Sequence, residues 1–404
     1  MVAGRGRAAR HRRGRDVHRG GDHLARGRVV GVDLARLRQL RLHVQGVREP
    51  VAASAPEVVE RFVAVQSQEF VPAQWGLAAR VRSEHRPDAA SVAASIDRGE
   101  ILRTHVLRPT WHFVSPADAR WLLELSADRV HRLNATYYRR VGLEGEAAAR
   151  GLDVVARALE GGHRTRAQLT AALDEAGSPM AGLAFGYLLM LAELERVAIS
   201  GANVGKQRTY AAFDERVPAS APKPRDEALA ELAERFIGSR GPANERDFAA
   251  WSGFTLGDAR QAFADAADRS DGRITTVDVD GAAQWLDTST VPDAAAAASA
   301  TDSDTDRVDL LQAYDEYIMG YAAPRAYLQS PERPAPVGAE FPLHALMIGG
   351  VMCGRWAPVV NAKHAVVRIV PWRTFSPAEE RSLAASVAEL ERFLGLPVTV
   401  DRNS

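Results

Sequence analysis

The stretch HRTRAQLTAALDEAGSPMAGLAFGYLLMLAELERVAISGANVGKQRTYAAF, residues 163–213, is the most informative for the fold because its pattern predicts two helices and a hairpin in one run. Thr165, followed by Gln three residues later, caps a helix whose Leu169 and Leu173 point inward. A Gly-Ser-Pro sequence ends this helix, since glycine and proline interrupt the helical backbone. A second, mostly apolar helix is predicted at about 181–195.

The end of this stretch predicts a β-hairpin. Val197-Ala198-Ile199 is strand-like, the glycine-rich segment 201–207 turns the chain, and a return strand runs from Arg208 to Phe213. Helices followed by a hairpin are the order of a winged helix, which is a helix-turn-helix with a hairpin wing. Such units bind duplex DNA in many proteins, although others serve as protein–protein modules.

Two other segments repeat this order. In residues 240–286, two helices precede a pair of strand-like runs separated by Asp280-Gly281, and Asp-Gly is a strong hairpin signal. Residues 34–114 fit a third copy, which ends in the strand-like ILRTHVLRPTWHFV at 101–114. We therefore predict a helix-rich α+β fold with three tandem winged-helix units and a small C-terminal α+β segment.

The expected boundaries follow from these patterns and from composition. Residues 1–50 hold 13 arginines against 4 acids, but the first residues lack apolar periodicity and are expected to be disordered. An acidic Ala/Ser/Thr-rich stretch separates the third unit from the C-terminal segment. The predicted parts are a basic disordered extension at 1–33, winged helices at 34–114, 115–222 and 223–290, an acidic linker at 291–306 and the α+β segment at 307–404.

Composition excludes several classes of protein. The chain has 404 residues, 51 basic and 51 acidic side chains, and 46% hydrophobic residues, which is typical of a soluble globular protein. No apolar run approaches the roughly 18 residues of a membrane span. The single cysteine, Cys353, excludes an internal disulfide and a cysteine-cluster zinc site and fits a reducing compartment. We expect a cytoplasmic protein without membrane contact.

The candidate chemistry is an amide pair, Gln66-Ser67-Gln68, after the last turn of the helix that begins at Glu57. In an extended chain, residues two apart point to the same side, so the two amides would face together. Glutamines near a helix end are usually solvated or capping, so the pair alone is a weak signal. His112 is expected to be a satisfied core or groove histidine. Asp315 and Glu316 lie in the aromatic segment YDEYIMGY and are interpreted as structural.

Five blocks of sequence resemble the winged-helix DNA glycosylases of the AlkZ-like family. The blocks occur in matching order from about residue 35 to the C-terminus. They are RFVAVQSQEFVPAQWGLAAR at 61–80, ILRTHVLRPTWHFVSPAD at 101–118, GPANERDFAAWSG at 241–253, LLQAYDEYIMGY at 310–321 and GGVMCGRW at 349–356.

The resemblance implies that Gln66 and Gln68 are the catalytic pair, because the family carries a Gln-x-Gln motif there. Ser67 departs from the apolar middle residue that the family prefers. A glutamine at 68, where a related class has aspartate, implies the branch that excises bulky or crosslinked alkylpurines.

An uncharged pair suits such substrates. A purine alkylated at N7 or N3 already carries positive charge, so its glycosidic bond breaks without a strong general acid. The amides then need only orient water and stabilise the sugar cation. We therefore expect a monofunctional DNA glycosylase that hydrolyses this bond without metal, cofactor or lyase activity.

The expected partner is double-stranded, damaged DNA, bound by a monomer at the nucleoid. Four basic residues are candidates for phosphate contacts because they flank the predicted site or lie on the second wing: Arg103, Arg108, Lys206 and Arg208. Two alternatives stay open at this point. One is a winged-helix DNA-binding regulator or lesion-binding protein without catalysis, and the other is a protein-interaction scaffold.

Overall fold

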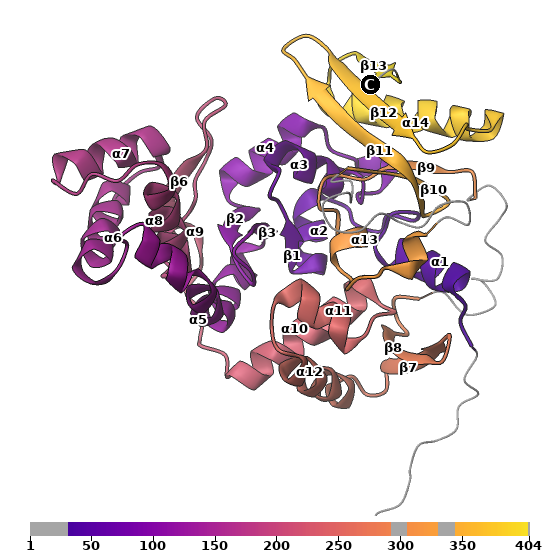
Figure 1. Ribbon diagram of the computed structural model, residues 1–404, viewed down its shortest axis with the longest axis horizontal. Helices are drawn as coiled ribbons and strands as arrows, with labels where there is room; N and C mark the ends of the chain where they lie inside the picture. Colours follow the sequence, from indigo (N-terminus) through magenta and orange to yellow (C-terminus); the bar gives the residue numbers. More distant parts are fainter. Residues whose placement is uncertain (1–30, 292–304, 330–343, 403–404) are drawn as a thin grey trace, which may run out of the picture.

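One order of elements recurs along the chain in the computed structural model, which describes residues 31–291, 305–329 and 344–402 (Figure 1). Unit 1 covers residues 55–114 and has an antiparallel sheet in the order β1-β3-β2. Its elements are α2 (Ala55–Phe62), β1 (Ala64–Gln66), α3 (Phe70–Ala78), a 3-10 turn η1 (Ser83–His85), α4 (Ala89–Arg98), β2 (Leu102–His105) and β3 (Trp111–Val114).

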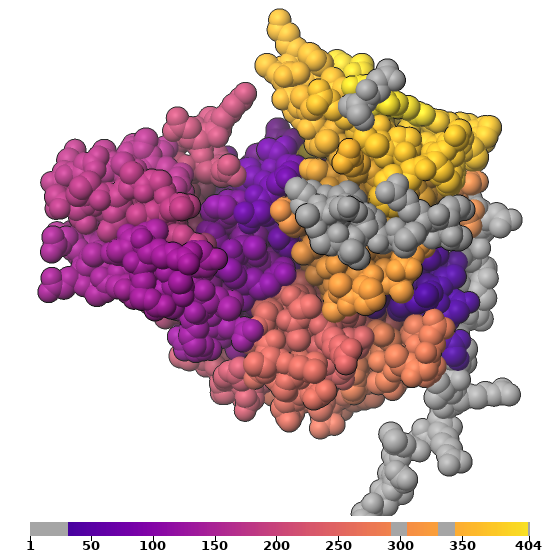
Figure 2. Space-filling model, viewed as in Figure 1, coloured from indigo at the N-terminus to yellow at the C-terminus, as the bar shows by residue number. Residues whose placement is uncertain are grey.

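Unit 2 covers residues 145–212 and repeats this order, with its sheet arranged β4-β6-β5. Its elements are α6 (Gly145–Leu159), β4 (Arg164–Thr165), α7 (Arg166–Glu175), α8 (Gly182–Leu194), β5 (Ala198–Ser200) and β6 (Thr209–Ala212). The long helix α5 (Pro116–Arg140) connects it to unit 1, and the short α9 (Phe213–Arg216) follows it. Unit 2 forms the lobe at the left of Figure 2.

Unit 3 covers residues 225–287 and keeps the helices and the final hairpin. Its elements are α10 (Arg225–Arg240), α11 (Glu245–Ser252), α12 (Leu256–Arg269), β7 (Ile274–Val279) and β8 (Ala282–Asp287). An isolated bridge between Ala243 and Trp285 lies where the other units have their first strand. Asp280 and Gly281 form the hairpin turn with φ angles of 48° and 82°, the left-handed backbone that Asp-Gly favours.

The C-terminal segment is a five-stranded sheet in the order β13-β12-β11-β10-β9, packed against one helix, α14 (Pro377–Leu394). Its strands are β9 (Val308–Leu310), β10 (Ala345–Ile348), β11 (Val351–Val360), β12 (Ala365–Pro371) and β13 (Val398–Asp401), and α13 (Glu316–Met319) and a 3-10 turn η4 (Ala326–Leu328) follow β9. The predicted helix-rich α+β class is confirmed.

The predicted cap at Thr165 is confirmed, and three serines cap other helices in the same way. Ser54, Ser115, Thr165 and Ser376 each accept a hydrogen bond from the backbone three residues on. The reciprocal half of the capping box is present only at Thr165 and Ser376 among these four. The Glu57 carboxylate instead accepts from the backbone of Ala53.

Three apolar cores tie the parts together. The largest joins α1 (Leu34–Val44), one face of the unit 1 sheet and the helices of unit 3. A second joins the helices of unit 1 to the C-terminal sheet and α14. The third lies mainly within unit 2. Unit 1 is thus covered on two sides, whereas unit 2 has a core of its own.

Two expectations fall on residues outside the described ranges. The basic extension at 1–33 and the acidic linker at 291–306 lie almost entirely there. In the described part of the chain, no helix combines the length and apolarity needed to cross a membrane.

Candidate functional site

Gln66 is the last residue of β1, a strand three residues long and buried throughout. Helix α2 ends at Phe62, and Val63 leaves it with a φ of 65°, so the chain turns sharply before it enters the strand. Gln66 therefore follows the last helical turn in an extended segment, and the turn at Val63 separates the two. Gln66 is only 3% exposed and pairs with His112 of β3.

Two charged residues hold Gln66. Its backbone N–H donates to Glu316 Oε1 at 2.8 Å, and Arg108 Nη2 donates to its side-chain Oε1 at 3.1 Å. A guanidinium can only donate, so the second bond identifies which end of the amide faces Arg108. Both the main chain and the side chain of Gln66 are therefore fixed.

A buried ion pair lies behind β1. Arg240 Nη2 donates to Glu316 Oε2 at 2.8 Å and to the carbonyl of Ala64 at 3.0 Å, and Arg240 has no exposed surface. Asp315, next to Glu316, forms a second buried pair with Arg80 at 2.6 Å. Asp315 and Glu316 were expected only to be structural. The structure adds that Glu316 joins this ion pair to the backbone of the candidate catalytic strand.

Gln68 lies in different surroundings from Gln66. Its side chain is exposed, and its Oε1 accepts from the backbone N–H of Trp111 at 3.4 Å. Between the two glutamines, Ser67 is fully buried, and its carbonyl accepts from Arg103 Nη2 at 2.9 Å. Gln68 lines the cavity described next, and Gln66 is not among its lining residues.

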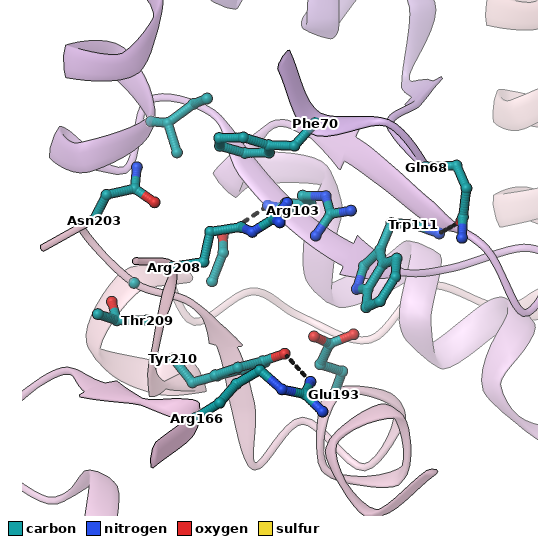
Figure 3. Close-up of a pocket in the computed structure, with 13 residues that line it drawn as sticks. Gln68, Phe70, Arg103, Trp111, Arg166, Glu193, Asn203, Arg208, Thr209 and Tyr210 are labelled. Carbon is teal, nitrogen blue, oxygen red and sulfur yellow. Dashed lines mark hydrogen bonds between the residues drawn. The ribbon is translucent and has the colours of Figure 1, made fainter. Parts of the chain in front are cut away.

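A cavity of about 160 Å³ lies between unit 1 and unit 2 (Figure 3). Strands β2 and β5 bring the two units together here, and Ser200 Oγ accepts from the backbone of Arg103 at 2.7 Å. The aromatic lining residues are Phe70, Trp111 and Tyr210, and the cationic ones are Arg103, Arg166 and Arg208.

The guanidinium groups of the cavity stack on aromatic rings. Arg103 Cζ lies 4.3 Å from the centre of the Trp111 ring, and Arg208 Cζ lies 4.9 Å from that of Phe70. Burial, together with the charge of Arg208, lowers the pKa of Arg103 to about 10. Arg103 is still protonated at neutral pH, so two like charges are held close together. Such a pair favours an anion with several acceptor oxygens.

Only one carboxylate lines this cavity among the described residues, and it is already engaged. Glu193 Oε2 lies 2.5 Å from His105 Nδ1 and accepts from the backbone N–H of His105 at 2.9 Å. Three arginines face this single carboxylate, so the cavity is cationic.

The hairpin between β5 and β6 carries Lys206 and Arg208, both exposed. Arg208 also lines the cavity, whereas Lys206 does not. Arg108 lies in the connection between β2 and β3, and burial lowers its pKa. The structure therefore groups the predicted residues in three places, namely Gln68, Arg103 and Arg208 at the cavity, Arg108 with Gln66, and Lys206 on the hairpin.

His112 differs from its expected role as a satisfied histidine. It has no exposed surface, its Nδ1 lies 3.0 Å from the carbonyl of Thr110, and its Nε2 has no hydrogen-bond partner among the described residues. Burial, followed by the charge of Arg108, lowers the pKa of His112 to about 3. Sequence alone gave no signal for this burial, because the strands on either side of His112, β1 and β2, are separate segments of the chain.

No three His, Cys, Asp or Glu side chains within 31–291, 305–329 and 344–402 gather closely enough to hold a metal ion. The groups that can act on a ligand here are amides, guanidinium groups, a neutral imidazole and aromatic rings. This set can bind a phosphate, stack on a base and orient water.

Comparisons with known proteins agree with each other. The model of a family described as DNA glycosylase AlkZ-like matches residues 59–393. An interstrand DNA cross-link repair glycosylase from Streptomyces sahachiroi is 26% identical over 378 residues, which cover 89% of this chain and 97% of that protein. The solved structure of Streptomyces sahachiroi DNA glycosylase AlkZ has a TM-score of 0.71 at 22% identity, with 92% of this chain and all of that one covered.

Proposed function

The chain belongs to the AlkZ-like DNA glycosylase family, and on that premise we propose that it hydrolyses the N-glycosidic bond of alkylated purines, including bulky or crosslinked ones. The observation that carries this proposal is Gln68 at the edge of an arginine- and aromatic-lined cavity, two residues from a rigidly held Gln66. The similarity to a protein named as a cross-link repair glycosylase supports the bulky substrates.

Gln66 and Gln68 are the proposed catalytic pair. An alkylated purine is a cationic leaving group, so its departure needs no strong acid, and the sugar is left with positive charge. Each amide oxygen has two lone pairs, and Gln66 Oε1 uses one of them to accept a hydrogen bond from Arg108. The other is free to accept from the attacking water, while the exposed Gln68 amide faces the sugar.

Phosphates of the DNA complete the electrostatics of the site. Arg103 and Arg208 at the cavity, Lys206 on the hairpin and Arg108 near Gln66 are the proposed phosphate contacts. These cations oppose a developing sugar cation until bound phosphates neutralise them. Catalysis is therefore expected only on the assembled DNA complex.

Water, not an amine, is the proposed nucleophile. A lyase reaction needs an amine that forms a Schiff base with the sugar. None of the described residues that line the cavity is a lysine. We therefore propose that the enzyme is monofunctional and leaves an intact abasic strand.

We propose further that units 1, 2 and 3 are winged helices within domains 34–114, 115–222 and 223–290, followed by the C-terminal segment at 307–404. The support is the shared element order and the matching sheet orders β1-β3-β2 and β4-β6-β5. The proposed assembly is one chain bound to damaged double-stranded DNA at the nucleoid. Light scattering of the complex tests the number of bound chains.

The test is base release from a duplex with a single 7-methylguanine, detected by alkaline cleavage of the abasic site. We expect product from the wild type and a loss of about 100-fold or more in the Gln66→Ala/Gln68→Ala double variant. Gln261→Ala, an exposed glutamine on α12, is the matched control and should match the wild type. Strands should stay uncut without alkali.

A duplex with a crosslinked purine is the second substrate. Product from the crosslinked duplex but not from 7-methylguanine would restrict the enzyme to bulky lesions. Release at the wild-type rate by the double variant would contradict the assignment of the glutamines. Tight binding of undamaged DNA with no product from either substrate would instead favour a DNA-binding protein without catalysis.

A further inference from the structure

A row of three polar side chains crosses the unit 1 sheet. Gln66 of β1 is directly opposite His112 of β3, and His112 is directly opposite Thr104 of β2. Directly opposite residues of neighbouring strands project from the same face, so these side chains are adjacent. All three are buried, with exposed fractions of 3% for Gln66 and zero for the others.

Unpaired polar atoms concentrate around this row. Among the described residues, thirteen buried side-chain atoms have no hydrogen-bond partner, and five of them belong to the unit 1 sheet and its loops. They are Ser67 Oγ, Thr104 Oγ1, Arg108 Nε, Thr110 Oγ1 and His112 Nε2. Each such atom costs about 1–3 kcal/mol when it stays unpaired, so this concentration needs an explanation other than chance.

Three of these atoms have complementary chemistry. Thr110 O can only accept, so His112 Nδ1 carries the hydrogen and His112 Nε2 presents a lone pair. Arg108 Nε is a donor, and the Thr104 hydroxyl both donates and accepts. Arg108 is close enough for its charge to lower the pKa of His112. One donor, one acceptor and one hydroxyl match the needs of a water molecule.

We propose that His112 and Thr104 are positioning residues for Gln66, which hold one buried water molecule that also accepts from Arg108 Nε. This inference rests on the proposed function, because it assigns the water a role through Gln66. The water fixes the guanidinium plane of Arg108, whose Nη2 in turn holds Gln66 Oε1.

The consequence for Gln66 is a defined amide orientation. A flipped amide would point its NH2 group at the guanidinium of Arg108, placing donor against donor. Arg108 therefore selects the orientation in which Oε1 keeps a second lone pair for the attacking water. Loss of the buried water releases Arg108 and lets the amide turn, which lowers the rate of bond cleavage without weakening DNA binding.

The test uses Thr104→Val and His112→Phe, which remove the polar atoms with little change of shape. Base release is measured under single-turnover conditions with saturating protein, and the Kd for the same DNA is measured separately. We expect each variant to lower the rate about tenfold or more with a Kd within about twofold of the wild type. Thr104→Ser keeps the hydroxyl and should restore at least a third of the wild-type rate.

Thermal unfolding separates positioning from a structural role. Thr104→Val replaces a hydroxyl by an apolar group of the same shape, so we expect its Tm to change little. His112→Phe also removes the hydrogen bond from Nδ1 to the Thr110 carbonyl, so its Tm should fall, and Thr104→Val is the variant that separates positioning from stability. A slower rate in Thr104→Val accompanied by a large fall in its Tm, which Thr104→Ser shares, would overturn the proposal. So would wild-type rates in Thr104→Val and His112→Phe.

The pH profile gives a further readout. His112 is expected to stay neutral from pH 5 to 8, so the wild-type rate should show no inflection that His112→Phe removes. Its charged neighbours are Arg108, Arg240 and His105. An inflection lost in His112→Phe would make His112 a base that accepts a proton, and would overturn the positioning role.

A high-resolution crystal structure of the unliganded protein keeps the two proposals distinguishable. We expect a water within hydrogen-bond distance of His112 Nε2 and Thr104 Oγ1 in the wild type, and its loss in Thr104→Val. If the wild type releases no damaged base, the proposed function fails. The presence or absence of this water in the crystal structure still tests the proposed hydrogen-bond network. Absence of the water from the wild-type structure would overturn the inference even in an active enzyme.

Discussion

Units 1 and 2 share an order of helices, strands and sheet neighbours, yet they differ in what covers their sheets. In unit 1 the row of Gln66, His112 and Thr104 is polar and lies beneath neighbouring parts of the chain. Unit 2 buries an apolar core of its own and exposes Lys206 and Arg208 on its hairpin. The same scaffold thus encloses a buried polar row where other parts of the chain cover its sheet, and presents an exposed basic hairpin where they do not.

The largest effect that this comparison predicts concerns the ion pair behind β1. Glu316→Gln leaves Arg240 charged, buried and without its carboxylate, so the free energy of unfolding should fall by about 3–5 kcal/mol. Urea unfolding followed by fluorescence measures this change. Arg157→Ala is the matched control in unit 2, because it breaks an exposed pair with Asp153 and should cost less than about 1 kcal/mol. Equal costs for the two variants would refute the contrast between the units.

The second prediction concerns the loss of folding stability at low pH. The folded pKa of His112 is about 3, below its ordinary value of 6.5, so the unfolded chain binds a proton between these values and the folded chain does not. Stability therefore falls as the pH drops from 6.5 toward 3, by about 3 kcal/mol at pH 4 from this residue. The measurement is the unfolding free energy against pH for the wild type and His112→Phe, whose curve should be flatter by this amount.

The half-buried His163 of unit 2 is the matched control for the acid effect. Burial, followed by the charge of Arg216, also lowers the pKa of His163, but its side chain is less buried than that of His112. His163→Phe should flatten the curve by less than His112→Phe does. If His163→Phe flattened the stability curve more than His112→Phe, unit 2 would be the more acid-sensitive unit, contrary to this prediction.

A smaller effect is expected at the hairpin. Arg208→Ala and Lys206→Ala should each weaken DNA binding about tenfold at most, or about 1.4 kcal/mol, and reduce the salt dependence by about one counterion. Their single-turnover rate at saturating protein should not change. Gln68→Ala should do the reverse, with a lower rate and the same Kd. Fluorescence anisotropy at several salt concentrations measures binding, and a loss of rate in Lys206→Ala would contradict this division.

The smallest effect is a gain in stability. Ser67 is buried and its hydroxyl has no partner among the described residues, so Ser67→Ala should raise the free energy of unfolding by about 1 kcal/mol without loss of activity. Ser126 on α5 is the control, since its buried hydroxyl donates to Leu122 O at 2.7 Å. Ser126→Ala should therefore destabilise the protein, and calorimetry compares the two variants.

Sequence predicted the local features well. The cap at Thr165, the Asp280-Gly281 turn and the strand-like run up to Val114 all depend on neighbouring residues, and the structure shows them. The family followed from five blocks in order. The strand that carries Gln66 was harder, because a three-residue strand is too short for a periodic signal.

Contacts between distant segments could not be predicted from one sequence. Arg240 reaches Ala64 and Glu316 from helix α10, and the cavity forms only where units 1 and 2 meet. Glu316 was set aside as structural because its neighbours are aromatic. The unpaired Nε2 of His112 depends on how three strands and a loop pack together, which a single sequence does not show.

The self-contained core of unit 2 has a consequence for how such enzymes diverge. Its apolar residues, among them Leu169, Leu173 and Leu188, contact mainly one another. A substitution in this core can therefore be compensated by changes within unit 2 alone. A change in unit 1 must instead suit unit 3 and the C-terminal sheet at once. Inherited variation should therefore accumulate in unit 2, which we propose contacts the DNA, and new lesion preferences can then arise while the reaction is kept.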